Sequence, residues 1–93
     1  MQGTGRKLHS DSFLVFVLAR SEPGPTRMGV TASRKIGGAV VRNRVKRCVR
    51  EVFRRHKLLF PTGLDVVFIA KKNAVDVAYD QVEREIEKLC RKF

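Results

Sequence analysis

Acidic residues are scarce in this 93-residue chain, and tryptophan is absent. Nine Asp and Glu residues stand against 20 Lys and Arg, which gives a formal net charge of +11. An excess of one sign destabilises a compact chain through self-repulsion unless a polyanion neutralises it. The imbalance therefore favours a nucleic-acid partner, with an anionic membrane surface as the next alternative.

Cysteine is also scarce, since Cys48 and Cys90 are the only two in the chain. They lie far apart, each falls in an apolar helical pattern, and no Cys-x-x-Cys motif occurs. This arrangement argues against a zinc site or a disulfide scaffold, and it favours two reduced thiols that face the core. His9 and His56 are equally distant from each other. We expect the protein itself to bind no metal.

Long hydrophobic runs are missing as well. No apolar run approaches the roughly 18 residues that a membrane span needs, and no signal-peptide-like segment follows the opening residues. We therefore expect a cytoplasmic protein that forms a single domain over residues 1–93, with residues 1–5 disordered. No Ser/His/Asp, Cys/His or acidic two-metal grouping is visible, so we expect no catalytic residue in the protein.

Three strands are predicted from β-branched and aromatic runs. The first covers residues 7–18, with Phe13, Val15 and Val17 on one face and Leu14, Phe16 and Leu18 on the other. Because both faces are apolar, we expect both to be covered. A turn-rich segment at 21–26 predicts an antiparallel hairpin with a second strand over 27–33. The apolar run at 64–70 predicts a buried inner strand.

Two amphipathic helices are predicted, over residues 39–56 and 77–91. The first apolar stripe consists of Val41, Val45, Cys48, Val49, Val52 and Phe53. The second consists of Tyr79, Val82, Ile86, Leu89 and Phe93. These elements predict an α+β fold, a small two-layer sandwich in which a long basic helix and a C-terminal helix pack on a mixed sheet.

The first predicted helix carries a strongly basic side opposite its apolar stripe. At about 100° per residue, this side contains Asn43, Arg44, Lys46, Arg47, Arg50, Arg54 and Arg55, and Arg42 lies at the margin of the apolar stripe. Glu51 is its only acid, with Arg47 and Arg55 at i±4 spacing, and Arg34 and Lys35 extend the patch just before the helix. An evenly mixed face would be merely solvated, as we expect for Asp80, Glu83, Arg84, Glu85, Glu87 and Lys88 in the last helix. The lopsided face predicts RNA contact, because guanidinium groups suit phosphates and base edges.

A motif in this region resembles a known family. Ser33-Arg34-Lys35-Ile36-Gly37, followed by Arg42-Asn43-Arg44-Val45-Lys46-Arg47, is similar to the signature of the protein subunit of bacterial ribonuclease P. Segments 5–13, 65–71 and 79–93 resemble other parts of that family in the same order, so the resemblance covers residues 5–93. It implies a fold like the second domain of a small-subunit ribosomal protein.

The resemblance also implies a division of labour. The RNA subunit, with its bound magnesium ions, would remove the 5′ leader from precursor tRNA, while the protein binds that RNA and holds the leader. The implied contacts with the RNA subunit are Arg34, Lys35, Arg42, Asn43, Arg44, Lys46, Arg47 and Arg50. The implied leader site is the open face of the sheet, where strand parity places Leu14 and Phe16. Phe16 would stack on an unpaired base, with Lys71 and Lys72 neutralising phosphates, and plain core packing is the alternative for Phe16.

The start of the chain departs from the family pattern. Family members usually have a further helix before the first strand, whereas only Met1-Gln2-Gly3-Thr4 precede Gly5 here. We expect this departure to uncover an apolar strip on the sheet and to favour self-association or a rearranged terminus.

Three other functions remain open on the sequence alone. They are ribosomal-protein-like binding of rRNA, insertion of the basic helix into a DNA major groove, and binding of that helix to a membrane surface. Groove insertion is disfavoured because Val41, Val45 and Val49 interleave with the basic residues and must pack on the sheet.

Overall fold

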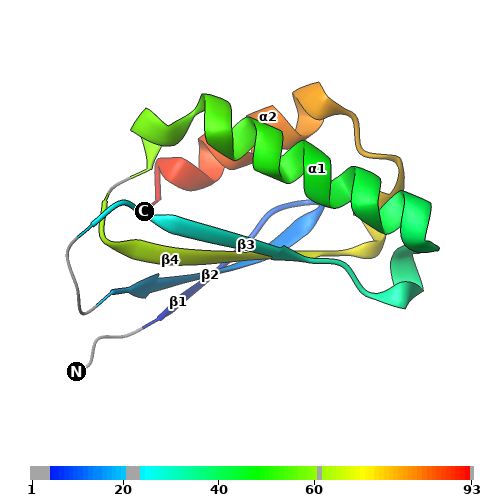
Figure 1. Cartoon of the computed structure of the whole chain (residues 1–93), viewed down its shortest axis with the longest axis horizontal. Helices are drawn as coiled ribbons and strands as arrows, with labels where there is room; N and C mark the ends of the chain where they lie inside the picture. The colour runs from blue at the N-terminus through cyan, green and yellow to red at the C-terminus, as the bar shows by residue number, and fades with distance from the viewer. Residues whose placement is uncertain (1–4, 21–23, 61, 93) are drawn as a thin grey trace.

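The computed structural model describes residues 5–20, 24–60 and 62–92 and arranges them in two layers (Figure 1). One layer is a sheet of four strands: β1 (Arg6–His9), β2 (Phe13–Ala19), β3 (Arg27–Thr31) and β4 (Leu64–Ala70). The other layer contains α1 (Ala39–Arg55) and α2 (Tyr79–Cys90), which both lie on one face of the sheet. Three short 3-10 turns connect these elements: η1 (Arg34–Ile36), η2 (Lys57–Leu59) and η3 (Lys72–Asp76). The predicted α+β sandwich with two helices on a mixed sheet is confirmed.

The sheet has the order β1-β2-β4-β3, and two predictions about it were wrong. The predicted strand 7–18 is a hairpin, because the chain turns back at Ser10, whose amide donates to the Phe13 carbonyl at 2.8 Å. The predicted hairpin between the first two apolar strands does not form, because β4 lies between β2 and β3. β3 pairs with β4 in parallel, which the long crossover through α1 allows.

The core lies between the sheet and the helices. Its fully buried side chains come from both layers and include Phe13, Val15, Val45, Val49, Val52, Phe68, Val82 and Ile86. The rings of Phe13 and Phe68 meet edge to face with their centroids 5.9 Å apart. The two predicted apolar stripes are thus confirmed at their centres. Val41, Cys48, Phe53 and Tyr79 lie half-buried at their edges, and Phe93 is outside the described residues.

The opposite face of the sheet is open over the part of the chain that the structure describes (Figure 1). The strand register places Leu14 and Phe16 of β2 beside Ile69 and Val67 of β4 on this face. All four side chains are half-buried. The parity prediction for β2 is confirmed, but within the described residues no element covers this second face. The expected disorder of residues 1–5 concerns, apart from Gly5, residues outside the described ranges.

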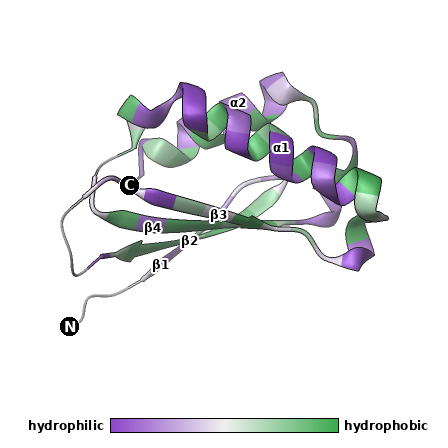
Figure 2. Ribbon diagram, viewed as in Figure 1, coloured by the Kyte–Doolittle hydropathy of each residue, from purple (hydrophilic) through white to green (hydrophobic). Residues whose placement is uncertain are grey.

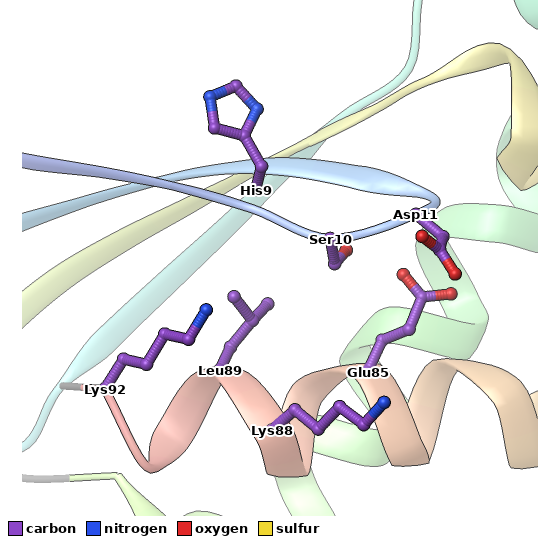
Figure 3. Close-up of a pocket in the computed structure, with 7 residues that line it drawn as sticks. All are labelled: His9, Ser10, Asp11, Glu85, Lys88, Leu89 and Lys92. Atoms are coloured by element: carbon purple, nitrogen blue, oxygen red, sulfur yellow. The ribbon is translucent and has the colours of Figure 1, made fainter.

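A buried carboxylate joins α2 to the turn between β1 and β2. The sequence pattern predicts a solvated Glu85, but only 8% of this residue is exposed. The Ser12 amide donates to Glu85 Oε1 at 2.9 Å, and Ser12 Oγ donates to Oε2 at 2.7 Å. Gln81 Nε2 also donates to Oε2, at 3.0 Å. Figure 3 shows Glu85 reaching from α2 toward the turn, while His9 points away from the helix.

These contacts couple the stability of the fold to pH. Burial raises the pKa of the Glu85 carboxyl, but hydrogen bonds from the turn serines and Gln81 outweigh burial and leave that pKa below its ordinary value. A carboxyl of this kind stabilises the fold above its unfolded pKa of about 4.3. That contribution is lost as the pH falls through the lower, folded-state pKa.

We predict that Glu85→Ala lowers the free energy of unfolding by about 1–3 kcal/mol at neutral pH, because both Ser12 donors stay buried without an acceptor. Urea unfolding followed by circular dichroism measures this change. Glu87→Ala, the same substitution two positions along α2, should have a smaller effect. The wild type should lose more stability than Glu85→Ala as the pH falls below about 4.3. Equal stability of Glu85→Ala and Glu87→Ala at neutral pH would contradict the stabilising role given to Glu85.

Candidate RNA interface

The basic side of α1 faces away from the sheet because its valines hold the other side in the core. Val45, Val49 and Val52 are fully buried, so the arginines and lysines between them point outward. Figure 2 shows hydrophilic and hydrophobic residues alternating along α1, whereas β2 and β4 are mostly hydrophobic. Of the residues predicted to contact the RNA subunit, Arg42 and Lys46 are half-buried and the others are exposed. The exposed ones are Arg34, Lys35, Asn43, Arg44, Arg47 and Arg50.

A shallow depression of about 330 Å3 runs along this side of α1. It is lined by Asn43, Lys46, Arg47, Arg50, Glu51 and Arg54. Among the described residues, Lys46, Arg47 and Arg50 have no hydrogen-bond or ion-pair partner. Their ammonium and guanidinium donors are therefore available to phosphate oxygens.

The two arginines of the Arg-Asn-Arg motif have different surroundings. Arg44 Nη1 donates to the Val77 carbonyl at 3.2 Å, and its Nη2 donates to the Val75 carbonyl, so Arg44 ties α1 to η3. Arg42 is half-buried, and its Nε is buried with no partner among the described residues. A buried donor without an acceptor is unfavourable. Arg42 Nε is therefore suited to an acceptor that a ligand supplies.

The single acid of α1 pairs with the arginines at the end of the helix. Glu51 Oε2 lies 2.5 Å from Arg54 Nη2 and 3.1 Å from Arg55 Nε. Hydrogen bonds from Arg54 and then Arg55 lower the pKa of Glu51, so its carboxylate is charged at neutral pH. Of the two partners that helical spacing predicts, Arg55 is confirmed, whereas Arg47 makes no contact with Glu51 in the described structure.

The turn before α1 holds Arg34 and Lys35 outside the core. Ser33 Oγ accepts a hydrogen bond from the Lys35 amide at 3.3 Å, and Ile36 is buried. Gly37 ends the turn with φ of 151°, a conformation that side chains rarely adopt. A Cβ atom on Gly37 would lie 2.9 Å from Val41 Cβ. Only glycine therefore allows this close junction between η1 and α1.

The predicted leader residues come from two places, the open face of the sheet and the segment after β4, and they are not equally available. Leu14 and Phe16 are on that face, and Lys72 is exposed in η3. Lys71 Nζ donates to the Ser10 carbonyl at 2.8 Å, so its ammonium is tied to the β1–β2 turn.

Sequence reasoning missed four further residues of this face, Lys7, His9, Val67 and Ile69. Lys7 is paired with Phe16 and His9 with Leu14, while Val67 and Ile69 come from β4. The alternation within 64–70 could have identified Val67 and Ile69. Lys7 and His9 could be placed on this face only by recognising the β1–β2 hairpin.

Three further expectations concern thiols, metals and membranes. Cys48 and Cys90 are free and half-buried, and burial raises the pKa of both thiols, that of Cys90 to about 11. In the described ranges, no three His, Cys, Asp or Glu side chains are placed to hold a metal ion. None of the helices in those ranges combines the length and apolarity needed to cross a bilayer.

The fold and this surface define the class of protein: a small α+β RNA-binding protein in which one helix turns its cationic side away from the core. The family model described as Ribonuclease P matches residues 2–93. The chain belongs to the ribonuclease P protein family. The ribonuclease P protein component of Desulfovibrio desulfuricans is 48% identical over 92 residues, which cover 96% of this chain and 71% of that protein. That of Halalkalibacterium halodurans is 38% identical over 88 residues, covering 95% and 74%.

Solved structures give the same result. The ribonuclease P protein from Thermotoga maritima superposes with a TM-score of 0.87 at 32% identity, over 96% of this chain and 84% of that one. The Staphylococcus aureus protein superposes with a TM-score of 0.84 at 31% identity, over 95% and 80%. The predicted family is confirmed, and with it a role beside ribonuclease P RNA in tRNA processing.

We predict that Gly37→Ala lowers the free energy of unfolding by about 1–3 kcal/mol, because it forces a side chain into a strained backbone and against Val41. Chemical denaturation measures the loss. Gly38→Ala is the matched control, since φ there is −74° and nothing lies within 4 Å of its added Cβ. Gly38→Ala should be clearly milder, and equal losses would refute the role given to Gly37.

Proposed function

We propose that the outward side of α1, together with η1, binds the RNA subunit of ribonuclease P during removal of the 5′ leader from precursor tRNA. The observation that carries this proposal is the row of donors without protein partners along the depression of α1, at Lys46, Arg47 and Arg50. Asn43 lines the same depression. Arg42 lies just before it in α1, and Arg34 and Lys35 lie in η1. Arg44 belongs to this surface but uses two donors to hold η3.

We propose that the protein positions RNA and that the RNA subunit, with its own magnesium ions, performs the cleavage. The surface supports this division because guanidinium and ammonium groups donate hydrogen bonds but accept none at neutral pH. Such groups neutralise phosphates and orient a strand, and they are not suited to take a proton from water. We expect this work to occur in the cytoplasm, where Cys48 and Cys90 stay reduced.

We also propose that the open face of the sheet holds the 5′ leader. The half-buried side chains of Leu14, Phe16, Val67 and Ile69 form an apolar strip there, and the exposed Lys7 and His9 flank it on β1. An aromatic ring in such a strip can stack on an unpaired base whatever the sequence. Lys72 would add a phosphate contact, and Lys71 would add its charge from a fixed position. Self-association through the same strip is the competing use.

We predict that Lys46→Ala, Arg47→Ala and Arg50→Ala together weaken binding to ribonuclease P RNA and flatten its salt dependence. If about five phosphates are neutralised, log K falls with log salt at a slope of roughly −4, and losing three contacts brings the slope to about −2. Filter binding over a range of salt concentrations measures both slopes. The control is the triple variant Arg84→Ala, Lys88→Ala and Arg91→Ala, called the α2 triple variant, which removes equal charge from α2 and the residue that follows it.

The same variants test the function itself. Wild-type protein added to ribonuclease P RNA at low magnesium should stimulate cleavage of precursor tRNA, and the α1 triple variant should stimulate it much less than the α2 triple variant. No stimulation by the wild type overturns the proposed function. A folded α1 triple variant with unchanged affinity and slope overturns the assignment of the surface.

We predict that Phe16→Ala weakens binding of precursor tRNA to the reconstituted ribonucleoprotein by about 1–3 kcal/mol through the lost stacking on the leader. Binding of mature tRNA, which has no leader, should be unchanged. Phe16→Tyr should retain most of the affinity, and Leu58→Ala, at a fully exposed apolar residue of η2, is the control. Equal losses for precursor and mature tRNA would argue against a leader site.

A further inference from the structure

We propose that Glu51 confines RNA binding to the part of α1 that precedes it and so lowers the affinity of the protein for unrelated polyanions. The inference rests on the proposed RNA-binding function and assigns a specificity role within that surface. It concerns the only acidic residue in a 17-residue helix.

The contacts of Glu51 divide the basic side of α1 into two parts. The carboxylate accepts from both Arg54 Nε, at 3.2 Å, and Arg54 Nη2, at 2.5 Å, which is a two-pronged pairing. Arg55 Nε donates to the same carboxylate at 3.1 Å, and the Arg55 guanidinium lies 5.8 Å from the centroid of the Tyr79 ring. The two arginines at the end of the helix are therefore engaged within the protein.

The part before Glu51 is different. Lys46, Arg47 and Arg50 have no hydrogen-bond or ion-pair partner among the described residues, although they line the same depression as Glu51 and Arg54. Burial does not explain this contrast, since Arg54 and Arg55 are themselves well exposed, at 64% and 61% of their side chains. The carboxylate explains it.

An RNA strand that crosses the end of α1 must place phosphates beside a carboxylate and compete with it for Arg54. Like charges that approach within a few ångströms repel each other even in water, which at low salt weakens binding roughly 5-fold. A polyanion attracted only by charge would cover the whole side of the helix and meet this penalty. An RNA whose shape fits the part of α1 before Glu51 avoids this repulsion. Discrimination follows because specificity is a difference between two affinities.

The test is Glu51→Gln, which keeps the size of the side chain and an oxygen acceptor but removes the charge. Affinity for ribonuclease P RNA and for an unrelated structured RNA of equal length is measured by filter binding at several salt concentrations. The unrelated RNA should bind about 5-fold tighter at low salt, with a slope steeper by about 1–2 as Arg54 and Arg55 reach phosphates. Affinity for ribonuclease P RNA should rise less, so the preference falls.

Two controls isolate the carboxylate. Glu87→Gln on α2 makes the same change in net charge away from this surface and should leave the preference unchanged. Adding Arg54→Gln and Arg55→Gln to Glu51→Gln should restore the wild-type slope, because the released donors are then removed. Circular dichroism of each variant checks that α1 is intact.

The outcomes separate this inference from the function on which it rests. Suppose that the Lys46, Arg47 and Arg50 triple variant loses affinity for ribonuclease P RNA while Glu51→Gln binds both RNAs as Glu87→Gln does. The role of Glu51 is then overturned and the proposed function stands. If Glu51→Gln tightens both RNAs equally, Glu51 only weakens binding and does not discriminate. If the triple variant binds as the wild type does, both proposals fall.

Discussion

Burial of the valine stripe of α1 against the sheet determines where the positive charge of the molecule lies. Val45, Val49 and Val52 are fully buried, and the helical period then leaves Lys46, Arg47 and Arg50 no position except the outer side. The repulsion among these cations is tolerable because they project into solvent, where a polyanion can reach them. Packing and the proposed RNA-binding surface are thus two consequences of one amphipathic pattern.

Side-chain contacts between distant segments keep the two layers in place around this helix. Glu85 holds the β1–β2 turn against α2 through Ser12, and Arg44 links α1 to η3. His56 Nε2 lies 2.7 Å from Glu83 Oε2, which joins the end of α1 to α2. Both helices lie on one face of the sheet, and the apolar strip around Phe16 lies on the opposite face. The proposed RNA-subunit and leader surfaces are separated by the thickness of the protein.

The parts that sequence predicts well are those with a strong local period. The α1 stripe and the inner strand at 64–70 follow from spacing and composition alone, because burial imposes a regular pattern on residues close in the chain. The β1–β2 hairpin was missed because its turn is short and its neighbours have strand-forming side chains. The parallel pairing of β3 with β4 depends on a crossover that no local pattern reveals. Glu85 was misread, and the contacts of Arg44 with Val75 and Val77 were not foreseen, because the partners of both residues are far away in sequence.

The central claim is that the outward side of α1 contacts ribonuclease P RNA, and footprinting of lysines by acetylation tests it most directly. The protein is acetylated briefly with and without the RNA, and mass spectrometry measures each site. We predict strong protection of Lys46 and Lys35, with Lys88 on α2 and Lys57 after α1 modified at the rate of the free protein. Unchanged acetylation of Lys46 together with protection of Lys88 would contradict the account.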